Sequence, residues 1–141
     1  MAAVNYVAQA EKVIKSLIKV KTYKNKNGEI VEKKEIYLTT GQIRKFLSIM
    51  NSIGNKVSIF KAEKPEENKL PDELVEEIQY MRIKLIYQAG REKSVKEFLE
   101  KSELDKYIQK IGNSVKNFNI VFRYVEALVA YHKFYGGKEH E

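Results

Sequence analysis

The sequence predicts an all-α fold: a single-domain bundle of about five helices, with a basic loop or short hairpin inserted near residues 21–35. Three observations support this prediction. Apolar residues recur at spacings of three and four along most of the 141 residues, no extended alternating run lies outside the insert, and the length suits one hydrophobic core. We therefore expect one helical domain over residues 1–141, with a variable basic insert at 21–35 and a flexible tail at 137–141.

The first predicted helix spans residues 3–20, because its apolar residues share one side and its lysines lie on the other. The insert that follows is rich in lysine, asparagine and glutamate around Asn27-Gly28, which is a strong turn signal. A short hairpin is one interpretation of this segment. We favour a mobile basic loop, since few residues of the insert can be buried.

The second helix is predicted to begin at Thr39 or Thr40, either of which can cap it, and to end at Gly54-Asn55. A charged linker, residues 62–69, separates it from a third helix that Pro71 opens. Acidic residues stand near the start of the third helix and basic residues toward its end, which suits the helix dipole. They are Asp72, Glu73, Glu76 and Glu77, followed by Arg82, Lys84 and Arg91.

Two serines after the third helix have the pattern of N-caps. Ser94 is one, and Ser102 is the other, with Asp105 three residues later in a capping-box arrangement. We therefore expect a fourth helical region that is broken near Ser102 and closed by Gly112-Asn113.

The last helix is predicted to start at Asn113 or Ser114. Residues 119–138 form one strongly apolar, helix-length run that stops at Gly136-Gly137. Only a narrow stripe of this run is polar, so we expect neighbouring helices to cover it on most sides.

This run resembles the C-terminal signature of the small subunit of type III-A CRISPR effector complexes, the Csm complexes. Residues 39–47 (TTGQIRKFL) are similar to an internal helix start of that family, and residues 87–91 (YQAGR) are similar to its central motif. The three motifs occur in the family's order, and the resemblance covers the chain from about residue 6 to residue 138. The basic insert matches no pattern of the family.

Composition restricts the possible functions. The 26 lysines and arginines exceed the 19 acidic residues by seven, which favours an anionic partner, although a solvated lysine-rich surface has the same composition. The sequence has no cysteine, no secretory-signal pattern at its N-terminus, and no uncharged apolar run of the roughly 20 residues that cross a membrane. We expect a cytoplasmic protein with no membrane partner.

The sequence offers little for catalysis. Its only histidines are His132 and His140, and we expect His132 to pack or hydrogen-bond inside the fold. No zinc-protease, phosphate-loop or paired-aspartate motif is present. We therefore predict no enzymatic activity, no catalytic residue, no metal site, no cofactor and no small-molecule substrate.

For nucleic-acid binding, the best candidates are basic residues on the polar sides of the second, third and last predicted helices. They are Arg44, Lys45, Lys84, Arg91, Arg123 and Lys133. If those helices pack side by side, their polar stripes form one cationic strip, and Tyr80 and Tyr87 flank it. The alternative is that Arg123 pairs with Glu126 and that Lys84 meets Gln88 or solvent.

The resemblance implies a non-catalytic RNA-binding subunit of an RNA-guided antiviral interference complex. It implies guide and target RNA as partners, together with the backbone and large Csm subunits and further copies of the chain, stacked head to tail. It also implies that the subunit holds the RNA backbone without reading its sequence. We expect the stacked copies to join the acidic start of the third helix to Lys133 and Lys138 at the end of the last helix.

The residues alone also allow other functions. These are a stand-alone helical protein that binds nucleic acid nonspecifically, a protein-only adaptor, and a small ribonuclease.

Overall fold

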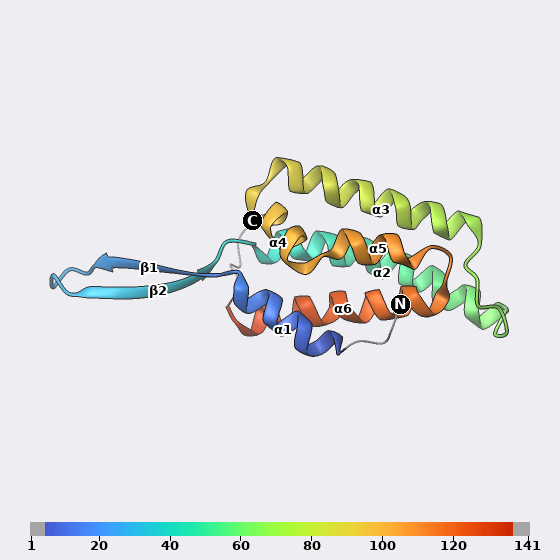
Figure 1. Ribbon diagram of the computed structural model, residues 1–141, viewed down its shortest axis with the longest axis horizontal. Coiled ribbons are helices and arrows are strands. Elements are labelled where there is room, and N and C mark those ends of the chain that lie inside the picture. The colour runs from blue at the N-terminus through green and yellow to red at the C-terminus, as the bar shows by residue number, and fades with distance from the viewer. Residues whose placement is uncertain (1–4, 137–141) are drawn as a thin grey trace.

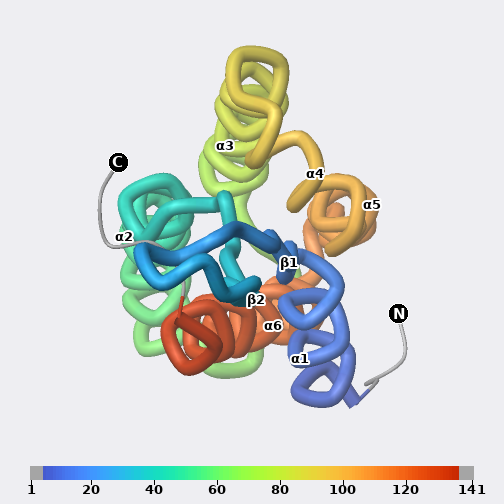
Figure 2. The backbone as a smooth tube through the Cα atoms, turned by 90° about the vertical axis from the view of Figure 1, so that its left-hand side faces the viewer, coloured from blue at the N-terminus to red at the C-terminus, as the bar shows by residue number. Residues whose placement is uncertain are grey.

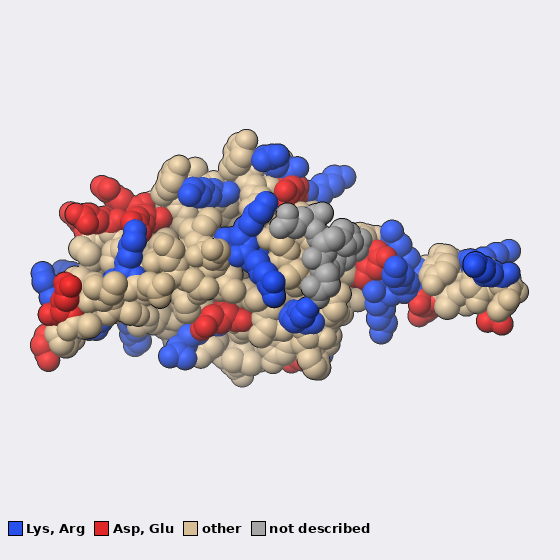
Figure 3. All heavy atoms as spheres, turned by 180° about the vertical axis from the view of Figure 1, so that it is seen from behind, with Lys and Arg blue, Asp and Glu red and all other residues tan. Residues whose placement is uncertain are grey.

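The computed structural model describes residues 5–136, in which a bundle of helices carries one projecting β-hairpin (Figures 1 and 3). In chain order the elements are α1 (Tyr6–Ser16), β1 (Ile18–Lys24), β2 (Ile30–Ile36), α2 (Thr40–Glu63), α3 (Asp72–Arg91), α4 (Lys93–Ser102), α5 (Leu104–Ile111) and α6 (Val115–Phe134). The described part is therefore mostly helical, with six helices and one two-stranded antiparallel sheet. The prediction of a helical bundle is therefore confirmed in part: the fold is predominantly α, but it also contains a two-stranded sheet, and the described part has six helices where about five were expected.

One contiguous apolar core receives residues from every helix. Helix α6 packs against α1, α2 and α5, while α3 packs against α2, α4 and α5 (Figure 2). Among the α6 side chains, Val121, Tyr124, Val125 and Leu128 are buried, whereas Arg123 is exposed. The prediction that neighbours cover α6 on most sides is confirmed. None of the helices in the described part is long and apolar enough to cross a membrane.

The segment after α1 is a β-hairpin. The predicted helix over residues 3–20 stops at Ser16, and Ile18 begins strand β1, which pairs with β2 from Ile18 opposite Ile36 to Lys24 opposite Ile30. Ile18, Val20 and Thr22 alternate with polar residues, and β-branched residues of that period favour a strand over a helix.

The hairpin turn is built by local hydrogen bonds. The side chain of Asn25 accepts from the backbone N–H groups of Asn27 and Glu29, and Gly28 has a positive φ of 79°. The prediction of a mobile loop at residues 21–35 is therefore wrong, and the hairpin alternative is correct.

Helix α2 continues eight residues beyond its predicted end at Gly54-Asn55. Its start is as predicted, because Thr39 and Gln42 form a reciprocal capping box. Gly54 does not end it, and the helix continues to Glu63. A Cβ atom built on Gly54 would lie 2.7 Å from Cε2 of Phe122, so this glycine lets α2 and α6 approach closely.

Neither Ser94 nor Ser102 is an N-cap, which corrects the prediction for this region. Glu92 stands at the cap position of α4, and the Ser94 hydroxyl donates instead to Oε1 of Gln42, at 3.1 Å. Ser102 is the buried last residue of α4. The predicted capping partner of Ser102, Asp105, forms an ion pair with α3, as described below.

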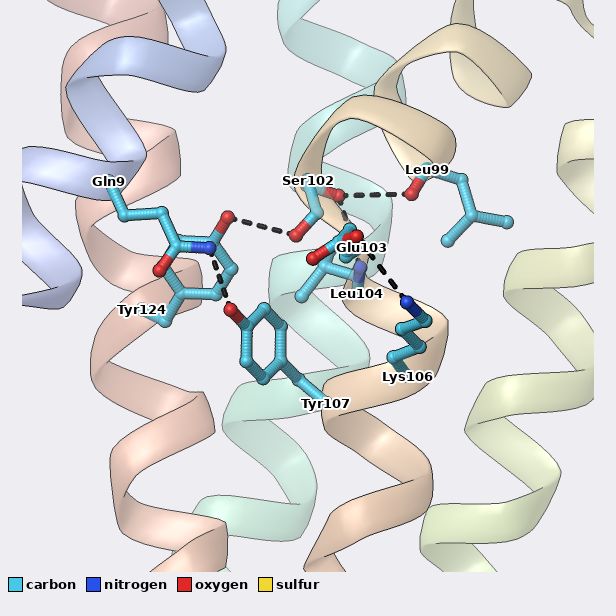
Figure 4. Close-up of polar contacts among 8 residues, drawn as sticks. All are labelled: Gln9, Leu99, Ser102, Glu103, Leu104, Lys106, Tyr107 and Tyr124. Carbon is cyan, nitrogen blue, oxygen red and sulfur yellow. Dashed lines mark hydrogen bonds and ion pairs between the residues drawn. The ribbon is translucent and has the colours of Figure 1, made fainter. Parts of the chain in front are cut away.

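The break between α4 and α5 is nevertheless where the sequence placed it (Figure 4). Glu103 has left-handed backbone angles there, with φ of 57°. The Ser102 hydroxyl accepts from the N–H of Leu104 at 3.3 Å, and the Tyr124 hydroxyl donates to the Ser102 carbonyl at 2.9 Å. The Tyr124 ring also meets Tyr107 edge to face, with centroids 5.3 Å apart. Tyr124 thus anchors the helix break to α6.

Both ends of α6 follow the prediction. The Ser114 side chain caps its start by accepting from the N–H of Asn117 at 3.0 Å. Gly136 follows its last turn with φ of 82°, and its N–H donates to the carbonyl of Lys133. Gly137, Lys138 and His140 lie outside the described residues.

Candidate nucleic-acid interface

The three helices that carry the predicted basic residues lie next to one another. Helix α2 packs against both α3 and α6, so that α3, α2 and α6 succeed each other along one side of the bundle (Figure 2). Figure 3 views this side. Lysine and arginine side chains gather over its middle, and acidic side chains gather at the end farthest from the hairpin. The predicted side-by-side arrangement of the three helices is thus present.

A groove of about 410 Å³ runs along the outer face of α3 and reaches α2. Three of the six predicted cations line it: Lys45 from α2, and Lys84 and Arg91 from α3. Tyr80 and Tyr87 line the same groove. The structure therefore brings the best aromatic and cationic candidates of the sequence into one place.

Each tyrosine of the groove lies close to a cationic side chain four residues later on α3. The Lys84 ammonium lies 4.7 Å from the centroid of the Tyr80 ring, and the Arg91 guanidinium lies 5.8 Å from that of Tyr87. Lys84 therefore contacts an aromatic ring, which differs from the alternative in which it meets Gln88 or solvent. The spacing of four residues that produces both pairs is visible in the sequence.

The outer face of α3 is unusually apolar for an exposed surface. Tyr80, Ile83 and Tyr87 are 59%, 60% and 66% exposed, and Ile86 is also exposed. These residues follow helical spacing, yet they lie on the side of α3 opposite its buried residues. An exposed apolar strip with flanking cations is suited to contact with a partner that has flat apolar faces and negative charge.

A second, smaller groove lies between α2 and α6. It measures about 300 Å³, and its polar lining includes Asn55 and Ser58 from α2 and Arg123 and Glu126 from α6. Within the described part of the chain Arg123 makes no ion pair, with Glu126 or with any other carboxylate. The structure thus leaves Arg123 exposed and unpaired beside hydrogen-bonding groups, in contrast to the alternative in which Glu126 neutralises it.

The other two predicted cations are separate from these grooves. Arg44 is exposed on α2 and lines neither groove, and Lys133 is exposed near the end of α6. The next residue toward the N-terminus, His132, is buried, and its Nε2 lies 2.6 Å from the carbonyl oxygen of Leu38. The prediction of a packing and hydrogen-bonding role for His132 is confirmed. Its contact also places the end of α6 beside the base of the hairpin.

Sequence reasoning missed a third hollow, which is larger. It measures about 810 Å³ and lies between the base of the hairpin and α4, lined by Tyr37, Lys93, Ser94, Lys96, Glu97, Glu100 and Lys101. One of these lining residues, Glu97, forms an ion pair with Lys19 of β1 at 2.7 Å. The charged residues of α4 recur at spacings of three and four, so the sequence did contain a signal for one polar face. Its mixed charge makes it a weaker anion site than the α3 groove.

The buried polar contacts of the bundle serve the fold. Burial raises the pKa of the Tyr124 hydroxyl above its ordinary value, which keeps this group a hydrogen-bond donor to Ser102. Arg82 on α3 donates to Asp105 on α5 at 2.5 Å, and this contact lowers the pKa of the Asp105 carboxyl. Across residues 5–136, no group of three or more histidine, aspartate or glutamate side chains has the arrangement of a metal site.

Comparison with known proteins agrees with the sequence motifs. Residues 6–138 match the family model described as Csm2 Type III-A. A protein of Streptococcus thermophilus named CRISPR system Cms protein Csm2 is 38% identical over 135 residues, which cover 96% of this chain and 94% of that protein. The protein of the same name from Mycobacterium tuberculosis (strain CDC 1551 / Oshkosh) is 36% identical over the same shares. That of Enterococcus italicus is 35% identical over 100 residues, covering 70% of this chain and 68% of that protein.

Proposed function

The chain belongs to the type III-A Csm2 family, and we propose that it is a non-catalytic, RNA-binding small subunit of a Csm interference complex. In this proposal several copies stack along the complex and hold the backbone of guide and target RNA without sequence specificity. The other Csm subunits and further copies of the chain are its protein partners. The complex acts in the cytoplasm against foreign nucleic acid.

The observation that supports RNA binding most strongly is the groove on α3. It combines Lys45, Lys84 and Arg91 with the exposed rings of Tyr80 and Tyr87. Cations attract phosphates of any sequence, and aromatic rings accept any base or ribose face. A groove of this composition therefore suits a sequence-independent contact, and base pairing with the guide would supply the specificity.

The distribution of charge supports stacking. The acidic start of α3 and the end of α6 that carries Lys133 lie at opposite ends of the bundle (Figures 1 and 3). A head-to-tail array needs two different, complementary surfaces on each copy. The separation of opposite charges meets that requirement.

RNA binding across a salt series tests the proposal. The triple variant Lys45→Ala/Lys84→Ala/Arg91→Ala is compared with the wild type, alone and assembled with the partner subunits and guide. Lys110→Ala, an exposed lysine on α5, is the matched control. We expect weak binding by the isolated protein, strong binding in the assembly, and a slope of log K against log salt that falls by up to about three in the triple variant.

Other outcomes identify the alternatives. Tight, salt-sensitive binding by the isolated monomer would indicate a stand-alone nucleic-acid clamp. Normal assembly with unchanged RNA binding in the triple variant would show that the groove is not the RNA site. In that case the smaller groove at Arg123 becomes the next position to change.

A further inference from the structure

The β-hairpin extends beyond the bundle, and its outer half does not contribute to the packing of the core (Figure 1). Its contacts with helices are at the base, where Ile18 and Ile36 join the core and Lys19 pairs with Glu97 (Figure 1). A two-stranded hairpin is at best marginally stable when neither face is covered. The outer half therefore has two open faces and two open edges that a partner can cover.

The outer half presents apolar side chains together with positive charge. Tyr23 and Ile30, near the tip, are 51% and 75% exposed, and Val20, nearer the base, is 55% exposed. Residues 18–36 contain six lysines and three glutamates, a net charge of +3. The three glutamates interleaved with the hairpin lysines make the hairpin a weaker site for RNA than the α3 groove, where three cations meet a single glutamate.

Not all hairpin lysines are available for a partner. Lys19 is paired with Glu97, and both Lys21 and Lys33 approach Glu35, at 3.8 and 3.3 Å. Lys24 and Lys26, near the tip, make no ion pair with any described residue. Lys34, opposite Val20 and nearer the base, also makes no ion pair with a described residue, so two of the three uncommitted lysines lie at the tip, farthest from the bundle.

The opposite end of the molecule has the complementary character. Residues 63–77, from the end of α2 into the start of α3, contain seven acidic residues and two lysines, a net charge of −5. We call this region the acidic pole. Within the described chain Glu73 and Glu76 make no ion pair, while Glu77 is held by Lys56 at 2.5 Å. Ile59, on the last turns of α2, adds an apolar side chain that is 61% exposed.

The hairpin and the acidic pole of one molecule cannot meet each other. They lie at the two ends of the long axis, with the whole bundle between them (Figures 1 and 3). Opposite charges placed at opposite ends favour a contact between molecules in one orientation and oppose the reverse orientation. A contact between different surfaces repeats in a line, which is a heterologous association.

We propose that the hairpin tip of one copy docks on the acidic pole of the next copy, and so joins consecutive copies in the stack. Lys24 and Lys26 meet the acidic side chains there, and Ile30 and Tyr23 cover apolar surface such as Ile59. The inference rests on the proposed function, because it requires more than one copy in the assembly. In this proposal the basic surface that meets the acidic pole is the hairpin tip, in place of the end of α6.

Site-directed cross-linking in the assembled complex tests the contact directly. The chain contains no native cysteine, so Lys26→Cys/Glu73→Cys provides one thiol at the tip and one at the pole. A short thiol-specific cross-linker should then produce a ladder of covalent multimers. The control Lys26→Cys/Lys106→Cys, with its second thiol exposed on α5, should not. A ladder from the control variant alone would overturn the inference. So would the absence of a ladder from both variants in a complex that contains several copies of the chain.

Charge reversal provides a second and independent test. Lys24→Glu/Lys26→Glu and Glu73→Lys/Glu76→Lys should each reduce the number of copies per complex measured by native mass spectrometry. An equal mixture of the two variants should restore it, because each reversed surface then finds its complement on the other variant. Circular dichroism confirms that both variants fold.

The outcomes separate this inference from the function on which it rests. Single reversals that leave the copy number unchanged would overturn the hairpin joint and leave stacking intact. A wild-type complex with one copy would instead contradict stacking itself. Loss of RNA affinity with an unchanged copy number in Lys24→Glu/Lys26→Glu would make RNA the occupant of the hairpin and overturn the joint.

Discussion

Helices α3 and α6 are both 20 residues long, and both carry tyrosines and branched aliphatic residues spaced by three or four. Their environments differ. On α6, Tyr124 and Leu128 are almost completely buried, whereas on the outer face of α3, Tyr80, Ile83 and Tyr87 are more than half exposed. The hydroxyl of Tyr124 is bound inside the chain, while the α3 rings lie against cations. The same residue types therefore build the core on one helix and an exposed apolar and cationic face on the other.

The largest expected difference between the two helices is in stability. Leu128→Ala on α6 should reduce the free energy of unfolding by about 2–5 kcal/mol, because it removes a fully buried side chain and leaves a cavity. Ile83→Ala on α3 should change it by less than about 0.5 kcal/mol, since this side chain is mostly in water already. Urea denaturation monitored by circular dichroism measures both.

Similar losses for Leu128→Ala and Ile83→Ala would contradict the comparison. They would mean that the outer face of α3 stabilises the fold, and the groove would lose its interpretation as a partner site. A self-associating protein could hide this result, so the measurement should be repeated at two protein concentrations.

The tyrosine hydroxyls should differ in the same direction but by less. Tyr124→Phe removes the donor to the buried Ser102 carbonyl, and we expect a loss of about 1–2 kcal/mol. Tyr87→Phe removes a hydroxyl from a ring that is 66% exposed, and we expect no measurable loss. The same denaturation experiment applies. A stable Tyr124→Phe protein would imply that the break between α4 and α5 does not depend on this bond.

The sequence predicted the helices whose signals are local. The Thr39 cap, the Ser114 cap and the Gly136 stop depend on side chains within a few residues of each other, and all three are as predicted. The end of α2 was missed because Gly54 looks like a stop signal in isolation. The glycine is needed because Phe122 of α6 packs against it, and a contact with another helix cannot be read from the local sequence.

The grouping of the candidate basic and aromatic residues was predicted in part for the same physical reason. Lys84, Arg91 and the two tyrosines belong to one helix, so their common face follows from helical spacing, and Lys45 joins them through the packing of α2 on α3. The polar composition of residues 21–35 favours a mobile loop, because few of these residues can be buried. The two strands of the hairpin are stabilised by pairing with each other and by the contacts of Ile18 and Ile36 with the core. Neither interaction can be predicted unless the pairing partner of each strand is known.

The two sides of α3 allow a finer comparison, because Arg82 is committed to an ion pair whereas Arg91 is not. Hydrogen bonding by Arg82, and secondarily by Gln109, lowers the pKa of Asp105. The stabilisation is thus fully present above the unfolded pKa of about 3.9 and is lost as pH falls through the lower folded value. Asp105→Asn should cost about 0.5–1 kcal/mol at pH 7, since both partners are about 30% exposed.

This difference between the wild type and Asp105→Asn should begin to shrink below about pH 4, where Asp105 becomes protonated in the unfolded state, and should continue to shrink as pH falls toward the lowered pKa of the folded state. Denaturation of the two proteins from pH 3 to pH 8 measures it. A difference that stays constant over this range would assign the effect of the substitution to shape and hydrogen bonding, with no contribution from charge.

The smallest effect on stability is expected at Arg91, where the consequence should be seen in binding. Arg91→Ala removes an exposed cation–π contact with Tyr87 and should cost at most about 0.5 kcal/mol of stability. In the assembled complex it should lower the salt slope of RNA binding by about one, because one phosphate contact is lost. Arg91→Lys keeps the charge and so should keep the slope, while its point charge lacks the planar fork of arginine and should weaken affinity. If Arg91→Ala instead destabilises the protein as much as Leu128→Ala does, the outer face of α3 contributes to the stability of the fold. The exposed face of α3 and the buried face of α6 would then not differ in the way proposed.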